Sequence, residues 1–139
     1  KRDTIFVFAG YNDEMQDFLA MNPGLRSRIG YTFHFEDYSP EELTEIYSRK
    51  MRGYGFSVTP GALEKVRSIM EYFQDVQNFG NGRFVRNILE KAKMNQASRL
   101  LEYDFDAITT EEIKTIKAVD ITPPPEVKKE VKRTIGFVY

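Results

Sequence analysis

The stretch that decides the fold is SPEELTEIYSRKMRGYG, residues 39–55, where the spacing of apolar residues takes on a helical period. It opens with Ser39-Pro40-Glu41-Glu42, a capping box with proline at the first helical position, and this combination predicts the start of a helix. The residues that would face a core recur three and four apart, at Leu43, Ile46, Tyr47 and Met51. Gly53-Tyr54-Gly55 predicts the end of this helix, because glycine readily terminates helices.

Three further helices are predicted downstream. The second starts at Thr59-Pro60, and its apolar side consists of Leu63, Val66, Ile69, Met70 and Phe73. The third follows a turn-rich loop at 78–82 and is expected over about 83–102, with an apolar side made by Val85, Ile88, Leu89, Ala92 and Leu100 and an opposite side made by Arg83, Arg86, Asn87 and Glu90. A second capping box at 109–112 predicts a short helix through Ile113 and Ile116. Residues 39–120 therefore predict an all-α, four-helix domain.

Residues 1–38 have a different pattern, that of a strand, a helix and a second strand. Residues 4–10 are apolar on both faces, which predicts a strand buried in a parallel sheet, and residues 30–35 predict a second strand. The helix between them would be capped by Asn12 or Asp13 and stopped at 22–24. Because two strands do not form a stable sheet alone, we expect the remaining strands to come from outside this chain. The predicted fold class is an α/β remnant followed by the four-helix domain, mainly helical overall.

A third region, residues 121–139, begins with Pro123-Pro124-Pro125, which is expected to be extended and to end the folded unit. The segment 126–133 mixes charges and is expected to be solvated, and the apolar residues 135–137 are a candidate for docking back onto the domain.

The composition of the 139 residues narrows the function classes. With no cysteine, Cys-ligated zinc, iron–sulfur clusters and thiol nucleophiles are excluded, and with one histidine a multi-histidine metal site is excluded as well. We interpret that histidine, His34, as a packing residue. The longest apolar run is far below the ~20 residues of a membrane span, and the net charge of −1, with bases interleaved among acids, argues against nucleic acid. We expect a cytoplasmic protein.

Four motifs occur in a distinctive order and spacing: Phe8-Ala9-Gly10-Tyr11, then NPGLRSRI at 22–29, FEDYS at 35–39 and NFGNGRFVRN at 78–87. Together they resemble the C-terminal half of an AAA+ ATPase, most closely the CbbX branch, which includes red-type Rubisco activases and stage V sporulation protein K. The resemblance covers about residues 3–120. It implies that 1–38 are the last strands and arginine-finger segment of a P-loop core, that 39–120 are the helical lid, and that 121–139 are a Pro-rich, charged tail.

The resemblance also implies cofactors and partners. The full-length protein would use ATP and Mg²⁺, but this sequence contains neither G-x-x-x-x-G-K-[ST] nor an apolar run ending in Asp-Glu, so we expect the chain alone to be inactive and to bind neither. The full-length protein would form a homo-oligomeric ring, usually a hexamer, and remodel a protein client. The tail favours the sporulation-type branch.

The resemblance assigns roles to six residues. Arg28 occupies the arginine-finger position, with Arg26 as the alternative or as a supporting charge, because a planar guanidinium stabilises the charge that spreads over the γ-phosphoryl oxygens. Arg83 occupies the sensor 2 position, where a cation at a helix N-terminus opposes the helix dipole unless a phosphate is bound. Arg86 either pairs with Glu90 or lines the same site. Either Asn12 or Tyr11 would be sensor 1, although Asn12 is equally explained as a helix cap.

Two other functions remain open at this stage. One is a helical protein-interaction module with no nucleotide role, which leaves residues 4–35 unexplained. The other is a nucleic-acid-binding helical domain, which would show strongly salt-dependent binding in a filter assay.

Overall fold

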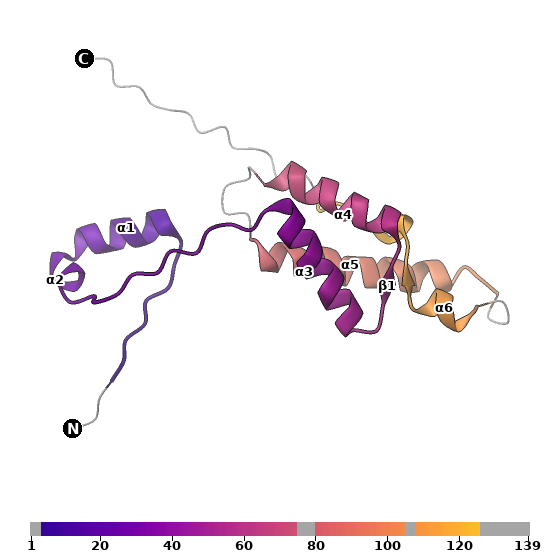
Figure 1. The fold of residues 1–139 in the computed structure, drawn as a ribbon, viewed down its shortest axis with the longest axis horizontal. Helices are drawn as coiled ribbons and strands as arrows, with labels where there is room; N and C mark the ends of the chain where they lie inside the picture. The colour runs from indigo at the N-terminus through magenta and orange to yellow at the C-terminus, as the bar shows by residue number, and fades with distance from the viewer. Residues whose placement is uncertain (1–3, 75–79, 105–107, 126–139) are drawn as a thin grey trace, which may run out of the picture. The chain divides into compact units, whose positions relative to one another are not determined.

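The computed structural model describes residues 4–74, 80–104 and 108–125, which divide between two compact units, Lys1–Asp37 and Tyr38–Tyr139. Figure 1 labels the elements of each unit. The predictions for residues 78–79 and for the tail from 126 onward lie outside the described residues. Among the described helices, none combines the length and the apolar character needed to cross a membrane.

Three helices form the body of the second unit, and all three were predicted. They are α3 (Pro40–Gly53), α4 (Pro60–Phe73) and α5 (Gly82–Leu100). The capping box of α3 is present, since Ser39 Oγ accepts from the Glu42 amide at 3.2 Å and the Glu42 carboxylate accepts from the Ser39 amide at 2.9 Å. Helix α3 ends just before Gly55, whose φ of 83° lies in the left-handed region where glycine is favoured.

The core of this unit is formed where α3, α4 and α5 pack together. Each helix contributes its predicted apolar side, including Leu43, Tyr47, Met51, Val66, Met70, Val85 and Leu89, all of them buried. Burial of one such side chain contributes about 1.5–3 kcal/mol. The core also contains Ile116 and Ile121, which come from beyond the three helices.

A small parallel sheet closes one side of the core, and the sequence patterns missed it. Strand β1 (Ser57–Val58) pairs with β2 (Thr115–Ile116), with Ser57 opposite Thr115. The helix predicted through Ile116 is wrong, because α6 (Thr110–Ile113) ends three residues earlier. Ile116 is fully buried, and its carbonyl accepts from the Thr59 amide at 3.0 Å, so tertiary pairing overrides the short helical pattern.

Polar side chains from the last turns of α5 hold the residues that follow α6. We call residues 112–122 the C-terminal strap; it contains β2 and the 3-10 helix η2 (Ala118–Asp120). Gln96 Nε2 donates to the Ile113 carbonyl at 2.7 Å, and Asn95 Nδ2 donates to the Asp120 carbonyl at 2.8 Å. The strap is therefore fixed to α5 by hydrogen bonds in addition to its buried isoleucines.

The first unit contains the predicted helix, α1 (Asn12–Met21), and a single further helical turn, α2 (Pro23–Arg26). The N-cap of α1 is Tyr11, and no side chain caps it, so the predicted capping by Asn12 or Asp13 is wrong. No residue of α1 is buried, but Phe18 is half-buried, and its ring lies 5.9 Å from the ring of Phe8 between centroids.

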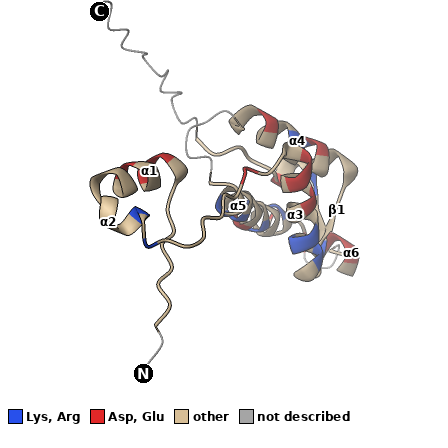
Figure 2. Ribbon diagram, turned by 60° about the vertical axis from the view of Figure 1, so that its left-hand side comes forward, with Lys and Arg blue, Asp and Glu red and all other residues tan. Residues whose placement is uncertain are grey.

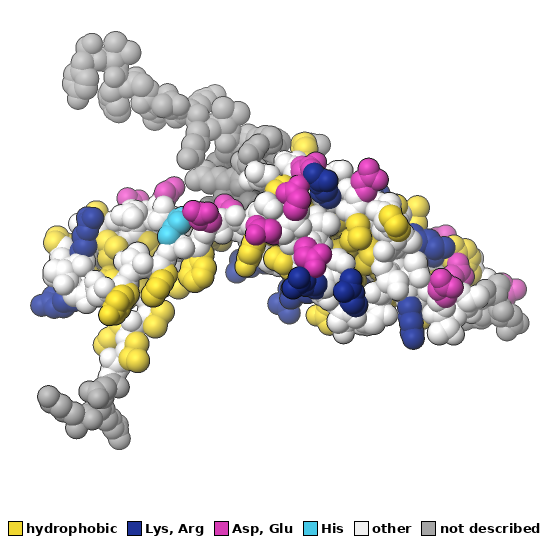
Figure 3. Space-filling model, in the orientation of Figure 1, with side chains coloured by type: hydrophobic (Ala, Val, Ile, Leu, Met, Phe, Trp, Pro, Cys, Tyr) yellow, Lys and Arg dark blue, Asp and Glu magenta, His cyan; other side chains and the backbone are white. Residues whose placement is uncertain are grey.

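The strands predicted at 4–10 and 30–35 are not formed in the described residues of this unit. Their apolar side chains are exposed instead, with Ile5 at 88%, Phe33 at 79% and Phe35 at 90% (Figure 3). The physical reason is that a parallel strand is stabilised by ladder hydrogen bonds to neighbours, and these segments pair with no described strand. His34 lies between the two phenylalanines and is exposed as well, so its predicted packing role is not observed.

Candidate functional site

The N-terminal end of α5 presents an arginine directly after a tight turn. The turn spans residues 80–83 and is closed by a hydrogen bond from the Arg83 amide to the Gly80 carbonyl at 2.8 Å. Arg83 is the second residue of α5, and its side chain is exposed. The first amides of a helix lack intrahelical partners and carry partial positive charge, and a neighbouring guanidinium adds to that charge. This end of α5 therefore has the properties of an anion-binding site.

Helix α5 is also the most basic element of the second unit. Its sequence, GRFVRNILEKAKMNQASRL, contains five cationic residues and one acid, although the whole chain has a net charge of −1 (Figure 2). The acid, Glu90, pairs with Lys93 at 2.8 Å, so the predicted pairing of Glu90 with Arg86 is not formed. Arg83 and Arg86 make no ion pair with any residue in the described part of the chain. Two uncompensated cations therefore lie in the first turns of α5.

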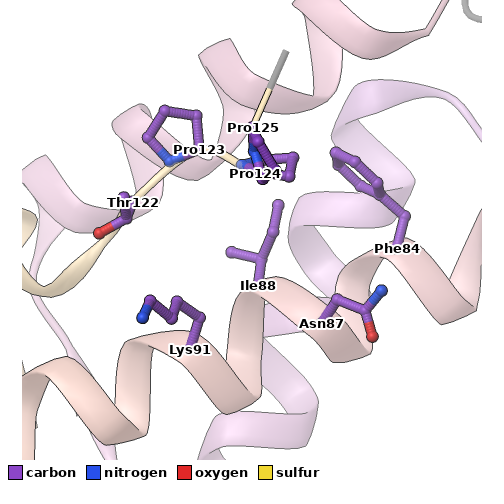
Figure 4. A pocket seen from close by; sticks show the side chains of 8 residues that line it. All are labelled: Phe84, Asn87, Ile88, Lys91, Thr122, Pro123, Pro124 and Pro125. Carbon is purple, nitrogen blue, oxygen red and sulfur yellow. The ribbon is translucent and has the colours of Figure 1, made fainter. Parts of the chain in front are cut away.

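A shallow hollow of about 290 Å³ flanks the same helix (Figure 4). One side is lined by four residues of α5, namely Phe84, Asn87, Ile88 and Lys91. The other side is lined by Thr122, the last residue of the strap, and by Pro123, Pro124 and Pro125, which follow it. The lining is mostly apolar, with the Lys91 ammonium and the Asn87 amide as its main polar groups. The three prolines, predicted to end the folded unit, thus form one wall of this hollow.

The two candidate arginine fingers lie together in the first unit. Arg26 ends α2 and Arg28 follows two residues later, and both side chains are exposed. The guanidinium of Arg28 donates from Nη1 to the Gly24 carbonyl at 2.9 Å, which folds it back along α2. Only one of its five N–H groups is used in this bond, so the other donors remain available to a phosphate.

The two candidates for sensor 1 lie at the other end of α1. Tyr11 is the N-cap and Asn12 is the first helical residue, and both side chains are exposed. A ten-residue helix is about 15 Å long, and α2 begins just after the C-terminal end of α1. The structure therefore brings Arg26 and Arg28 together, and Tyr11 and Asn12 together, but separates the two pairs.

Two groups with shifted pKa values, Tyr47 and Arg99, lie in and beside the core of the second unit rather than at these candidate sites. Burial raises the pKa of the Tyr47 phenol, and the negative charge of Asp120 raises it further. The hydrogen bonds from Arg99 to Asp120 raise the pKa of that guanidinium. The described residues contain no group of three or more metal-binding side chains.

The chain belongs to the AAA lid domain family, whose model matches residues 39–131, the span that contains α3, α4, α5 and α6. The predicted resemblance and fold class are thereby confirmed.

Named relatives extend this similarity into the first unit. The chain is 34% identical over 119 residues to protein CbbX of Cereibacter sphaeroides, which covers 86% of the chain and 38% of that relative. It is 38% identical over 122 residues to a chloroplastic ribulose bisphosphate carboxylase/oxygenase activase of Cyanidioschyzon merolae. This alignment covers 86% of the chain and 41% of the activase. It is 35% identical over 125 residues to stage V sporulation protein K of Bacillus subtilis, and this alignment covers 88% of the chain and 38% of that relative. The chain thus spans about two fifths of the length of these curated relatives.

Proposed function

We propose that the chain is the lid-bearing C-terminal part of an AAA+ ATPase, and that the full-length protein hydrolyses ATP with Mg²⁺. The observation that carries the proposal is the family match over residues 39–131, joined with two arginines at the start of α5 that form no ion pair with the described residues. A nucleotide phosphate is the ligand that such a helix terminus suits, because it accepts several charge-assisted hydrogen bonds at once.

In this proposal Arg83 binds phosphate from the lid, and Arg86, one turn further along α5, supports it. The donor set fits a phosphate, since both guanidinium groups are exposed and neither pairs with a described carboxylate. Bound nucleotide would supply the phosphoryl group and Mg²⁺ would neutralise its charge, with the metal ligands provided by parts of the protein outside this chain. Either Tyr11 or Asn12 would orient water from the start of α1.

In the proposal, Arg28 acts on the nucleotide of a neighbouring subunit in a homo-oligomeric ring, which the resemblance to AAA+ ATPases makes a hexamer. A guanidinium supplied in trans in this way contributes on the order of 10³–10⁵ to the rate of phosphoryl transfer. The exposure of both Arg26 and Arg28 supports this role, since an arginine finger must reach beyond its own subunit.

In the proposal, ATP hydrolysis drives the remodelling of a protein client in the cytoplasm. One relative is named as an activase of ribulose bisphosphate carboxylase/oxygenase and another as a sporulation protein. Because these two names refer to different cellular processes, we propose a protein client without naming a particular one.

The experiment that tests the proposal is steady-state ATP hydrolysis by the full-length protein, mixed in varying proportion with its Arg28→Ala variant. We expect activity to fall more steeply than simple dilution predicts, because each variant subunit also inactivates the site of its neighbour. Mixing with Arg49→Ala serves as the control, since Arg49 is an exposed arginine paired with Glu45 on α3. A linear decrease with Arg28→Ala would refute a finger acting in trans, and a full-length protein without ATP turnover would refute the proposed function.

A further inference from the structure

The side chain of Asn81 connects the start of α5 to the chain just before α3. Its side-chain Oδ1 accepts a hydrogen bond from the Tyr38 backbone amide at 3.1 Å, across 43 positions of sequence. Tyr38 is the first residue of the second unit, so its amide lies at the junction with the first unit. Asn81 is the N-cap residue of α5, two positions before Arg83. A single side chain thus connects the inter-unit junction with the proposed phosphate-binding end of α5.

The backbone of Asn81 is held in an unfavourable conformation. Its φ of 41° makes it the one non-glycine residue with positive φ in the described part of the chain, and its ψ is −114°. These angles are close to the first central position of a type II′ turn, where glycine is strongly preferred. Asn81 lies between two glycines, Gly80 and Gly82. A third glycine at position 81 would adopt the positive φ without strain. An asparagine here retains strain in the turn, and its side chain gains the bond to Tyr38.

Little flexible chain separates this hydrogen bond from the elements on either side. Next to Tyr38, the Ser39 capping box fixes the start of α3. Next to Asn81, the turn hydrogen bond from Arg83 to Gly80 fixes the start of α5. A displacement of the start of α5 would therefore be transmitted to the Tyr38 amide rather than absorbed by a loop.

We propose that Asn81 is a positioning residue that couples the nucleotide contact of Arg83 to the junction between the two units. This inference rests on the proposed function, because it requires Arg83 to respond to bound phosphate. Since coupling between two sites is reciprocal, a nucleotide that shifts Arg83 changes the junction, and a change at the junction alters how Arg83 meets the phosphate.

The test uses three variants of the full-length protein and follows hydrogen exchange at the Tyr38 amide. Asn81→Gly removes the acceptor and relieves the positive φ, so it separates the hydrogen bond from backbone strain. Asn81→Asp retains an Oδ acceptor for the amide. Thr109→Ala is the matched control, because it removes a cap bond of the same kind, from the Glu112 amide to Thr109 Oγ1 at 3.2 Å, elsewhere in the lid.

We expect Asn81→Gly to speed Tyr38 exchange about fivefold without nucleotide, the effect of losing one net hydrogen bond, while Asn81→Asp and Thr109→Ala retain the protection. In the wild type, exchange at Tyr38 should differ between ADP and a non-hydrolysable ATP analogue. Asn81→Gly should lose that difference and lower kcat about fivefold, with affinity for the analogue changed less than twofold. Loss of the difference with retained affinity is not expected from a merely structural role.

Several results would overturn the inference. Full protection of Tyr38 in Asn81→Gly would show that the hydrogen bond does not govern the junction, whatever the nucleotide does. An unchanged difference between ADP and the analogue in Asn81→Gly, together with its loss in Arg83→Ala, would remove the coupling through Asn81 and leave the proposed function intact. Normal nucleotide response in Arg83→Ala would refute both the sensor assignment and the coupling.

Discussion

Arg99 and Asp120 form a two-point ion pair at the edge of the lid core. Arg99 Nε lies 2.8 Å from Asp120 Oδ1, Arg99 Nη2 lies 3.1 Å from Oδ2, and the Asp120 side chain is 1% exposed. The second oxygen of Asp120 also accepts from the Lys117 amide at 2.8 Å. The Asp120 carboxylate is thus desolvated and depends on these donors, and the two bonds from Arg99 join the end of α5 to the C-terminal strap.

We expect Arg99→Ala to lower the free energy of unfolding of the chain by about 3–5 kcal/mol, because it leaves the Asp120 carboxylate buried without its counterion. Urea unfolding followed by far-UV circular dichroism measures this change. The control is Arg49→Ala, which breaks the exposed Arg49–Glu45 pair and should cost no more than about 0.5 kcal/mol. Equal losses in the two variants would contradict the assignment of Arg99 as the anchor of the strap.

Tyr47 gives a prediction at alkaline pH. Burial, and then the Asp120 charge, raise the pKa of its phenol above the ordinary value of 10.0, so the folded state keeps the proton that the unfolded state loses. The contribution of Tyr47 to stability is therefore complete below pH 10 and is lost as pH rises above it. Between pH 8 and pH 11 we expect the wild type to lose about 1.4 kcal/mol more than Tyr47→Phe, measured by urea unfolding at each pH.

At pH 8 itself, Tyr47→Phe should be no less stable than the wild type. The Tyr47 hydroxyl is buried and has no hydrogen-bond partner among the described residues, so its removal relieves a desolvation cost. A loss of more than about 1 kcal/mol at pH 8 would contradict this account of the hydroxyl.

The capping box of α3 gives a third prediction. Ser39→Ala removes the acceptor for the Glu42 amide and should lower the free energy of unfolding by about 1 kcal/mol. Ser68→Ala is the matched control: its hydroxyl donates to the Glu64 carbonyl within α4 and is exposed, so alanine there should be neutral or slightly stabilising. The same urea titration measures both variants, and a smaller loss for Ser39→Ala than for Ser68→Ala would contradict the prediction.

At the proposed site, Arg83→Ala in the full-length protein should weaken discrimination between ATP and ADP about tenfold, the loss expected for about 1.4 kcal/mol of phosphate interaction. Titration with each fluorescently labelled nucleotide measures the two dissociation constants. Arg86→Ala should have a smaller effect because it lies one turn further along α5. Unchanged discrimination in Arg83→Ala would remove it from the site.

The two candidate fingers can be distinguished by turnover and binding together. Arg28→Ala should abolish ATP turnover and leave ATP affinity within about twofold, because a finger stabilises the transition state more than the bound substrate. Arg26→Ala, which removes another exposed arginine of the same segment, should retain most of the turnover. The reverse result would assign the finger to Arg26.

Sequence patterns predicted the helical lid well because its signals are local. The capping box at Ser39, the proline at Pro60 and the helical spacing of Leu43, Tyr47 and Met51 each specify structure within one or two turns. The family resemblance also came from short motifs, and the comparison with known proteins confirms it.

The features that sequence patterns missed depend on residues far apart in the chain. The pairing of Ser57 with Thr115 and the hydrogen bond from Tyr38 to Asn81 have no local sequence signature. Ile116 fits the helical spacing of the sequence, although the helix itself ends at Ile113. The strands predicted at 4–10 and 30–35 show the converse, since an apolar run acquires strand structure only when neighbouring strands supply hydrogen bonds. The assigned roles of the arginines remain predictions.

The position of the strap has a consequence for how the lid is made. Ile116, Asp120 and Ile121 are among the last described residues of the lid, yet they are buried against elements that are synthesised much earlier. Helices α3 and α4 can therefore pair while the chain is still being translated. Strand β1 has no partner until residue 116 has left the ribosome, and α5 lacks the strap contacts of Asp120 and Ile121 until residue 121 has done so. Such late, long-range contacts slow folding, so an interrupted chain ending before residue 115 would expose an incomplete core to chaperones and proteases.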